Sequence, residues 1–294
     1  MGFIGHFVET ATGNTIKNRS SPYSKDQRFF QQVTCSTASH LKDKSPEQMV
    51  FEFSSWKADT QKGTLILIAR HGQTISNVYG RIIGSEVPYE DLTDKGVDDA
   101  KALAASLVQL KIQGKIGITS VHCSPLVRAV HTGNVIADQL EMTIDIHEGL
   151  REINWGKGSG LTDTERQNIS GEQEDLLMRQ HSGLMQLWDH LPSLEAAEKY
   201  NDVLDRALLE LQDISKRLPS NEREALLISH GRLINTLMRA CLVSPEDANR
   251  SEASDRGKVP YPGNCDIAVF LYDNSESRPQ LSFQGLIKYA RPAQ

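Results

Sequence analysis

The stretch Leu65–Thr74 reads Leu-Ile-Leu-Ile-Ala-Arg-His-Gly-Gln-Thr, an apolar run that ends in Arg70, His71 and a glycine. A second stretch, Leu226–Gly231, reads Leu-Leu-Ile-Ser-His-Gly. Short apolar runs bounded by turn residues are typical of buried parallel strands. Ligands of open α/β sheets bind outside the carboxyl ends of such strands. We therefore expect His71 and His230 to emerge at one edge of the sheet with a reacting group between them, which indicates an enzyme.

A third segment, Val121–Ala129, lies between the two histidines and reads Val-His-Cys-Ser-Pro-Leu-Val-Arg-Ala. It predicts the end of a strand over Ile116–Val121 and a helix that starts at Ser124-Pro125, which places Arg128 in the first turn at the same edge. A guanidinium repels a metal ion but grips a phosphoryl group through its planar fork. Backbone N–H groups after Arg70 and at helix N-termini add donors for the same anion. The three segments together indicate a phosphoryl site without a metal.

The rest of the chain alternates apolar runs with helical patterns. Further strands are predicted at Thr143–His147 and Ile267–Tyr272, with a weaker edge strand near Leu281–Phe283. The predicted helices are Asp94–Leu110, Pro125–Leu140, Gln173–His190, Leu194–Arg217 and Arg232–Leu242. This alternation predicts an α/β fold, a three-layer α/β/α sandwich with a mainly parallel central sheet. A helical cap over Asn154–His190 is expected above the strand carboxyl ends.

Composition describes an ordinary globular enzyme. The chain has 294 residues with a formal net charge of −6, 38% hydrophobic and 24% charged residues. An acidic chain argues against nonspecific nucleic-acid binding and against an anionic membrane surface. No apolar stretch approaches the ~20 residues of a transmembrane helix, and no secretory signal is visible. Four cysteines without close spacing predict reduced thiols and a cytoplasmic location.

We expect two regions along the chain, an extension over residues 1–62 and a catalytic domain over residues 63–294. The extension contains Ser45-Pro46-Glu47-Gln48, typical of a helix start, and the alternating stretch Met49–Phe53. It is too apolar for a purely disordered segment, so it is expected to pack against the catalytic domain or a second subunit. Whether the protein forms a homo-oligomer is left open.

In their order and spacing, the motifs resemble the histidine phosphatase superfamily, also called phosphoglycerate mutase-like. The matching segments are Arg70–Thr74 with Asn77, Ser124–Ala129, Leu150–Glu152 before Trp155-Gly156, and Ser229–Gly231. The resemblance covers roughly residues 64–289. Four segments in the family's order are far more specific than Arg-His-Gly alone.

The resemblance implies that His71 attacks phosphorus and forms a phosphohistidine, which water then hydrolyses. A free imidazole has a pKa of about 6.5. Arg70, Arg128 and a cationic His230 would disfavour protonation of His71 and keep it nucleophilic. The residues implied to hold the phosphoryl oxygens are Arg70, Arg128, His230 and Asn77, with Thr74 as a further contact. No cofactor is implied, and the expected partner is a small-molecule phosphate ester.

The resemblance also implies that Glu152 protonates the leaving oxygen and then activates water. Glu152 would have to carry a proton first, which an apolar setting from Ile153 and Trp155 could favour. The acid-phosphatase branch of the family instead has an aspartate after its second histidine. Gly231 follows His230 here, which disfavours that branch.

The segment Ala197–Arg206 resembles the family's Gly-Glu-Ser segment, although Ala197 and Lys199 replace its glycine and serine. The competing interpretation is a solvated helix face with i,i+4 pairs such as Asp202 and Arg206. We favour the solvated face over a role of Glu198 in the site.

Three functions remain open, and hydrolysis of a phosphorylated metabolite is preferred. A mutase is the second, but phosphoglycerate mutases carry Glu-Arg-His-Tyr where this chain has Glu152-Ile153-Asn154-Trp155, and a paired-arginine motif where Arg179 precedes Gln180. The third is a catalytically weak binding or regulatory member. Substrate choice is expected to depend on Gly80–Asp91, the cap and Ser244–Gly263, and the substrate itself is not predicted.

Overall fold

The computed structural model describes residues 17–18, 33–52, 63–162, 164–165, 197–219, 223–242, 259–274 and 279–289. Within these ranges the strands are β1 (Lys17–Asn18), β2 (Thr34–Thr37), β3 (Val50–Glu52), β4 (Thr64–Arg70), β5 (Ser120–Cys123), β6 (Ile144–Ile146), β7 (Glu224–Ser229), β8 (Ile267–Asp273) and β9 (Gln280–Lys288). The α-helices are α1 (Ile75–Val78), α2 (Asp94–Ile112), α3 (Val127–Leu140), α6 (Tyr200–Arg217) and α7 (Gly231–Leu242).

The described strands form one sheet in the order β1-β6-β5-β7-β4-β8-β9-β2, and β3 also pairs with β9. The pairs from β1 through β6, β5 and β7 to β4 are parallel, whereas β8 is antiparallel to both β4 and β9. The predicted mainly parallel sheet is therefore confirmed. Its parallel strands β4, β5 and β7 carry the three motifs at adjacent positions.

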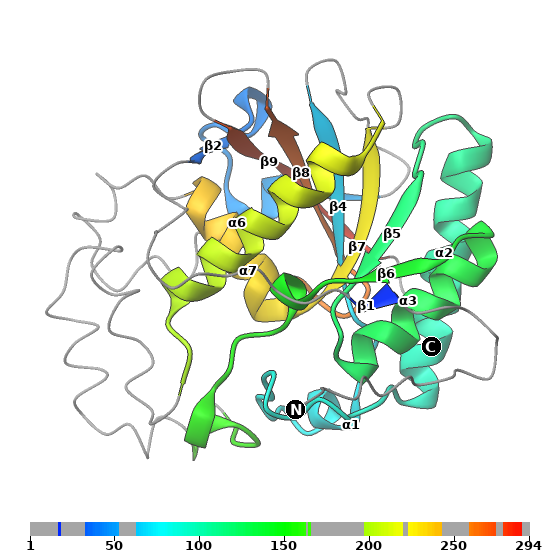
Figure 1. Ribbon diagram of the computed structural model, residues 1–294. Helices are drawn as coiled ribbons and strands as arrows, with labels where there is room; N and C mark the ends of the chain where they lie inside the picture. Colours follow the sequence, from blue (N-terminus) through cyan, green and yellow to red (C-terminus); the bar gives the residue numbers. More distant parts are fainter. Residues whose placement is uncertain are drawn as a thin grey trace, which may run out of the picture.

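Alternation along β4 divides the core into two layers. Ile66 and Ile68 pack with α6 and α7, while Leu65, Leu67 and Ala69 pack with α2 and α3. A strand buried on both faces needs apolar residues at every position, which is why β4 lacks the polar alternation of a half-exposed strand. Figure 1 shows α6 and α7 on one side of the sheet and α2 with α3 on the other, the predicted three-layer arrangement.

Part of the N-terminal extension joins this sheet. β2 and β3 both run parallel to β9, and Val33, Leu41 and Met49 are buried in the same core layer as α6 and α7. Residues 33–52 thus complete the sheet beyond β9. The turn predicted at Gly13-Asn14 lies outside the described residues.

Several predicted boundaries were wrong for identifiable reasons. The strand near Leu281–Phe283 is not at an edge, because β2 and β3 cover the side of β9 away from β8. The strand predicted over Ile116–Val121 forms its ladder only from Ser120, although Ile116 and Ile118 are buried.

Two predicted helices begin later than expected, and a third lies outside the described residues. Leu126 caps α3, so Ser124-Pro125 precede that helix instead of opening it. The helix predicted from Leu194 begins at Tyr200, with Lys199 as its extended N-cap. Of the expected cap, Asn154–Thr162 contains only a short 3-10 turn at Gly156–Gly158, and Gln173–His190 lies outside the described residues. No helix within the described ranges is long and apolar enough to cross a membrane.

Candidate active site

The register of β4 and β7 brings the two histidines together. Arg70 is the Cα partner of Ser229, so His71 and His230 each follow the last paired residue of neighbouring parallel strands. Their ring centroids are 5.2 Å apart, and both side chains are buried. The Val121–Ala129 segment lies next to them because Cys123 of β5 pairs with Ile228 of β7. The predicted meeting of the three segments at one sheet edge is confirmed.

The local hydrogen bonds fix the orientation of the His71 ring. Its Nδ1 lies 2.8 Å from the carbonyl oxygen of Gly72. A carbonyl can only accept, so Nδ1 carries the proton and the lone pair of the neutral ring is on Nε2. Burial lowers the pKa of His71 well below its usual value, and the positive charges of Arg128 and Arg70 lower it further. His71 is therefore a neutral imidazole with its basic nitrogen on Nε2.

The terminal nitrogens of Arg70 and Arg128 donate to backbone carbonyls of neighbouring loops. Arg128 donates from its two terminal nitrogens to the carbonyls of Val87 (2.9 Å) and Gly84 (3.2 Å), and Arg70 donates to the carbonyl of Pro262 at 2.9 Å. Arg128 is fully buried, and burial lowers the pKa of its guanidinium, an effect that Glu152 and two other glutamates oppose. A guanidinium nonetheless stays charged in proteins.

Three inner nitrogens at this place are buried and have no hydrogen-bond partner among the described residues: Nε of Arg70, Nε of Arg128 and Nδ1 of His230. The hydroxyl of Ser124 lies 2.7 Å from Nε2 of His230. When that hydroxyl donates, the ring proton of neutral His230 is on Nδ1, so all three nitrogens are donors. Buried donors left without partners cost free energy unless a ligand accepts from them. The three donors come from the three motifs at one edge of the sheet, and they suit the oxygens of one anion.

The surroundings of His230 disfavour the positive charge that the sequence predicts for it. Burial lowers its pKa well below the usual value, and the charges of Arg128, Arg206 and Arg70 lower it further. The sequence analysis expected nearby arginines to disfavour protonation of His71. The same arginines also lie near His230 and disfavour its protonation as well. With the Ser124 hydroxyl donating to Nε2, neutral His230 offers its Nδ1–H as a donor.

Thr74 and Asn77 lie directly after His71 and cap α1 reciprocally. Asn77 donates its backbone N–H to the Thr74 hydroxyl (3.3 Å), and the backbone N–H of Thr74 donates to Oδ1 of Asn77 (3.2 Å). Asn264 donates from Nδ2 to the same Oδ1 (3.0 Å) and to the carbonyl of His71 (2.9 Å). These contacts give both residues a role in shaping the loop around His71, and their phosphate contacts stay predictions.

Glu152 lies at the first turn of α7 and accepts from three backbone N–H groups. The donors are Ile153 (3.0 Å), Arg232 (2.9 Å) and Leu233 (3.0 Å). The carboxylate is buried, but its surroundings are only partly the apolar setting expected. The geometry therefore presents Glu152 as an oriented carboxylate beside His230.

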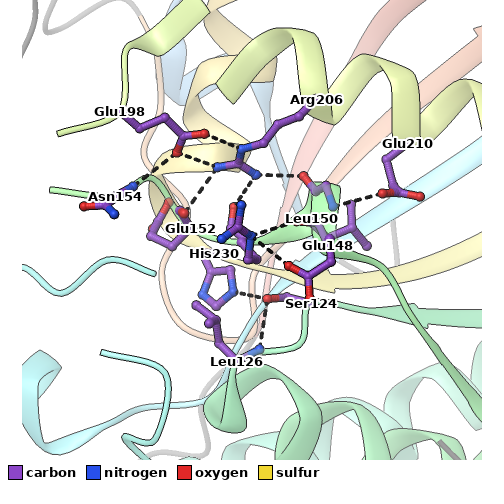
Figure 2. Close-up of polar contacts among 12 residues, drawn as sticks. Ser124, Leu126, Glu148, Leu150, Glu152, Asn154, Glu198, Arg206, Glu210 and His230 are labelled. Atoms are coloured by element: carbon purple, nitrogen blue, oxygen red, sulfur yellow. Dashed lines mark hydrogen bonds and ion pairs between the residues drawn. The ribbon is translucent and has the colours of Figure 1, made fainter. Parts of the chain in front are cut away.

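Arg206 corrects our interpretation of α6 as a solvated face. Its guanidinium is buried and donates to both carboxylate oxygens of Glu198 at 2.7 and 3.0 Å. It also donates to the carbonyls of Gly149 (2.8 Å), Arg151 (2.7 Å) and Glu152 (3.2 Å). Figure 2 shows this arrangement, with Glu198 and Arg206 above the segment that carries Glu152. The Glu198–Arg206 ion pair thus positions the backbone around Glu152, and Glu198 supports the site through Arg206.

The rim of the site includes two of the loops expected to determine substrate choice. Glu86, from the loop after α1, accepts from the backbone N–H of Trp155 at 3.1 Å. The described end of the loop before β8 places the Tyr261 ring 5.7 Å from the guanidinium carbons of Arg70 and of Arg232. Arg232 also lies 5.4 Å from the Trp155 ring. A second cation stacked between aromatic rings thus lies next to the phosphoryl donors.

Sequence reasoning missed three supporting contacts. Ser124 was interpreted only as a helix start, yet its hydroxyl orients His230. Thr132 bridges the motifs, since its hydroxyl accepts from the backbone N–H of Gly72 and donates to the carbonyl of Arg128. Asn264 lies 193 residues from His71. The role of Thr132 could have been found from its spacing, because it lies four residues after Arg128 on the same helix face. Asn264 has no such spacing to any residue of the motifs.

The chain belongs to the histidine phosphatase superfamily (branch 1), whose sequence profile matches residues 66–277. A similar curated protein is the probable phosphoglycerate mutase GpmB of Erwinia tasmaniensis, 29% identical over 63% of this chain and 78% of its own length. The 2,3-bisphosphoglycerate-dependent phosphoglycerate mutase of Sinorhizobium fredii is 36% identical over 38% of this chain and 51% of its own length.

Among solved structures, a mycobacterial glucosyl-3-phosphoglycerate phosphatase in complex with VO3 is 21% identical, with a TM-score of 0.56 over 76% of this chain and 98% of its own. A phosphoserine phosphatase from Entamoeba histolytica is 23% identical, with a TM-score of 0.54 over 75% and 96%. These likenesses support the α/β fold. The relatives include both mutases and phosphatases.

Proposed function

We propose that this protein is a phosphomonoesterase that hydrolyses a small phosphate ester through a phosphohistidine on His71. The observation that carries the proposal is the set of three buried, unpartnered nitrogen donors of Arg70, Arg128 and His230 beside the neutral Nε2 of His71. Such donors, fixed before the substrate arrives, stabilise charge that develops on the equatorial oxygens of a transferring phosphoryl group.

In the first step the Nε2 lone pair of His71 forms a bond to phosphorus, and the bond from phosphorus to the ester oxygen breaks. The leaving oxygen takes a proton from Glu152 in its protonated form. In the second step Glu152, now a carboxylate, accepts a proton from water as the water oxygen bonds to phosphorus. The N–P bond breaks, inorganic phosphate leaves, and His71 returns to its neutral state. The arginines supply the positive charge throughout.

The residues that follow Glu152 favour a hydrolase over a mutase. Positions that are basic in phosphoglycerate mutases are Ile153 and Asn154 here. The Ile153 side chain is buried, and the backbone N–H of Asn154 donates to the carboxylate of Glu198 while its carbonyl accepts from the Glu198 N–H. Neither offers a positive charge for retaining a bisphosphate intermediate. Release of the phosphoryl group to water is therefore the favoured outcome.

The test is hydrolysis of an aryl phosphate in EDTA by the wild type and by His71→Ala. We expect activity in the wild type and its loss in the variant, because an aryl leaving group needs only the phosphate pocket and the nucleophile. Equal activity in both would overturn the assignment of His71. With 3-phosphoglycerate as a second probe, release of inorganic phosphate indicates a hydrolase, whereas formation of 2-phosphoglycerate would indicate a mutase.

Glu152→Gln tests the proton-transfer role separately. The glutamine keeps the shape of the side chain but cannot donate and accept a proton. We expect the variant to retain the first, phosphorylating step with an aryl phosphate, measured as release of the aryl alcohol within one turnover. The same step should be about 10²–10⁴-fold slower with an alkyl ester, whose leaving oxygen needs protonation. Equal losses on both esters in this first step would mean that Glu152 only supports the site.

A further inference from the structure

A second cluster of ionisable side chains lies behind the phosphate pocket, on β5 and β6. Val121 and Cys123 of β5 and Ile144 and Ile146 of β6 all pack into the α2–α3 layer. Alternation therefore turns the residues between them toward α6.

Those residues are His122 and its parallel-register partner Asp145. His147 follows two positions after Asp145, so it lies on the same face. Two histidines and an aspartate thus share the α6 face of strands whose other face is apolar.

The outer nitrogens of both histidines are held in place. Nδ1 of His147 lies 2.7 Å from a carboxylate oxygen of Glu210 on α6, and Nε2 of His122 lies 2.9 Å from the hydroxyl of Ser120. The inner nitrogens, Nδ1 of His122 and Nε2 of His147, face each other at 2.9 Å. Since the carboxylate accepts from Nδ1 of His147, the neutral ring has its lone pair on Nε2. This is the tautomer that metal binding through Nε2 requires.

We propose that Nδ1 of His122, Nε2 of His147 and the carboxylate of Asp145 bind a divalent transition metal ion of the Zn²⁺ class. One ligand atom from each residue lies within 4.8 Å of the others. A tetrahedral zinc with Zn–N bonds of 2.0–2.1 Å separates two imidazole nitrogens by about 3.3 Å. The present 2.9 Å separation needs to open by only a few tenths of an ångström.

The surroundings match those of protein zinc sites beyond the three ligands. Metal-bound histidines commonly donate their other N–H to a carboxylate, which fixes the ring and raises its basicity. Glu210 holds that position for His147. On metal binding, His122 moves its proton from Nδ1 to Nε2, where the hydroxyl of Ser120 can accept it. Asp145 is partly exposed, so the ion can enter from solvent and keep a water as its fourth ligand.

Glu210 links the proposed metal site to the phosphate pocket by hydrogen bonds. The other carboxylate oxygen of Glu210 accepts from the backbone N–H of Gly149 at 2.9 Å, and the carbonyl of Gly149 accepts from Arg206. A metal at His147 would thereby fix β5, β6 and α6 together next to the segment of Glu152. The ion takes no part in the reaction, so chelator-treated protein is expected to keep its aryl phosphatase activity.

The test uses the full-length protein stripped with a chelator and titrated with Co²⁺, followed by visible absorption and thermal unfolding. We expect one equivalent of Co²⁺ with tetrahedral d–d bands, displacement by Zn²⁺, and a melting temperature that rises with Zn²⁺ concentration. Asp145→Asn and His147→Gln should each weaken binding by more than the roughly 10–100-fold that loss of an outer partner costs.

His131→Gln is the matched control, because His131 also pairs with an aspartate (Asp91, 2.6 Å) but is exposed and has only that one partner group in the described contacts. His131→Gln and His71→Ala should bind Co²⁺ as the wild type does. Absence of one-equivalent binding, unchanged affinity in Asp145→Asn, or a thiolate-to-Co²⁺ charge-transfer band would overturn the proposal. If His147→Gln does not fold, Asp145→Asn alone decides.

Discussion

Replacing Arg206 by methionine tests whether the Glu198–Arg206 pair supports the site as the structure indicates. The variant removes the five hydrogen bonds described above for the Arg206 guanidinium. It takes the guanidinium from the partly buried carboxylate of Glu198, which keeps only the N–H of Asn154 among the described donors, and from three backbone carbonyls. Breaking a buried ion pair by removing one partner costs about 3–5 kcal/mol. That is a large fraction of the roughly 5–15 kcal/mol by which a native protein is stable.

The assay is urea unfolding followed by far-UV circular dichroism. With an m-value of ~3 kcal/mol/M, a loss of 3–5 kcal/mol lowers the urea midpoint by roughly 1–1.7 M. Arg217→Met is the matched control, because Arg217 pairs with Asp213 at 2.6 Å on the same helix but both side chains are exposed. An exposed i,i+4 pair contributes only about 0.3–0.5 kcal/mol. If Arg206→Met lowers the midpoint no more than Arg217→Met does, our account of the pair is refuted.

Two further predictions concern the histidines and a glycine beside them. His71 and His230 are both buried with pKa values well below normal, so below about pH 6.5 each binds a proton on unfolding and stability falls as pH falls, by roughly 1.4 kcal/mol per pH unit for each. Urea midpoints between pH 7 and 5 should show this slope, and His71→Asn should reduce it; an unchanged slope in the variant would contradict the burial argument. Gly72→Ala should destabilise by more than 1 kcal/mol, because a Cβ there would lie 2.5 Å from the backbone oxygen of Gly96. Gly117→Ala, whose Cβ would meet atoms no closer than 3.7 Å, is the control in the same unfolding assay, and equal midpoints would count against the close packing.

The sequence predicted the parts of the site that depend on local pattern. The apolar runs before His71 and His230 determine buried parallel strands, and adjacent parallel strands deliver their following residues to one edge. The position of Arg128 was predicted for a similar reason. Ser124-Pro125 is a helix-start signal directly after a strand, and the first turn of such a helix lies at that edge of the sheet. The histidines and arginines of the phosphate pocket therefore follow from strand burial and helix start signals alone.

Arg206 and Asn264 could not be placed in this way. Arg206 lies four residues after Asp202, a spacing that is equally typical of a solvated pair, and only the position of α6 above Glu152 decides between the two. Asn264 reaches His71 across a separation that no local pattern covers. The backbone donors to Glu152 are likewise tertiary, because they depend on where α7 begins.

The most direct measurement of the central claim is to trap the covalent intermediate. The enzyme is mixed with an aryl phosphate, quenched within the first turnover in neutral denaturant, digested and sequenced by mass spectrometry. We predict a phosphoryl group on the imidazole of His71, formed at the rate of the first turnover and absent from His71→Ala. Turnover with no phosphoryl group on His71, or with one on another side chain, would contradict the account.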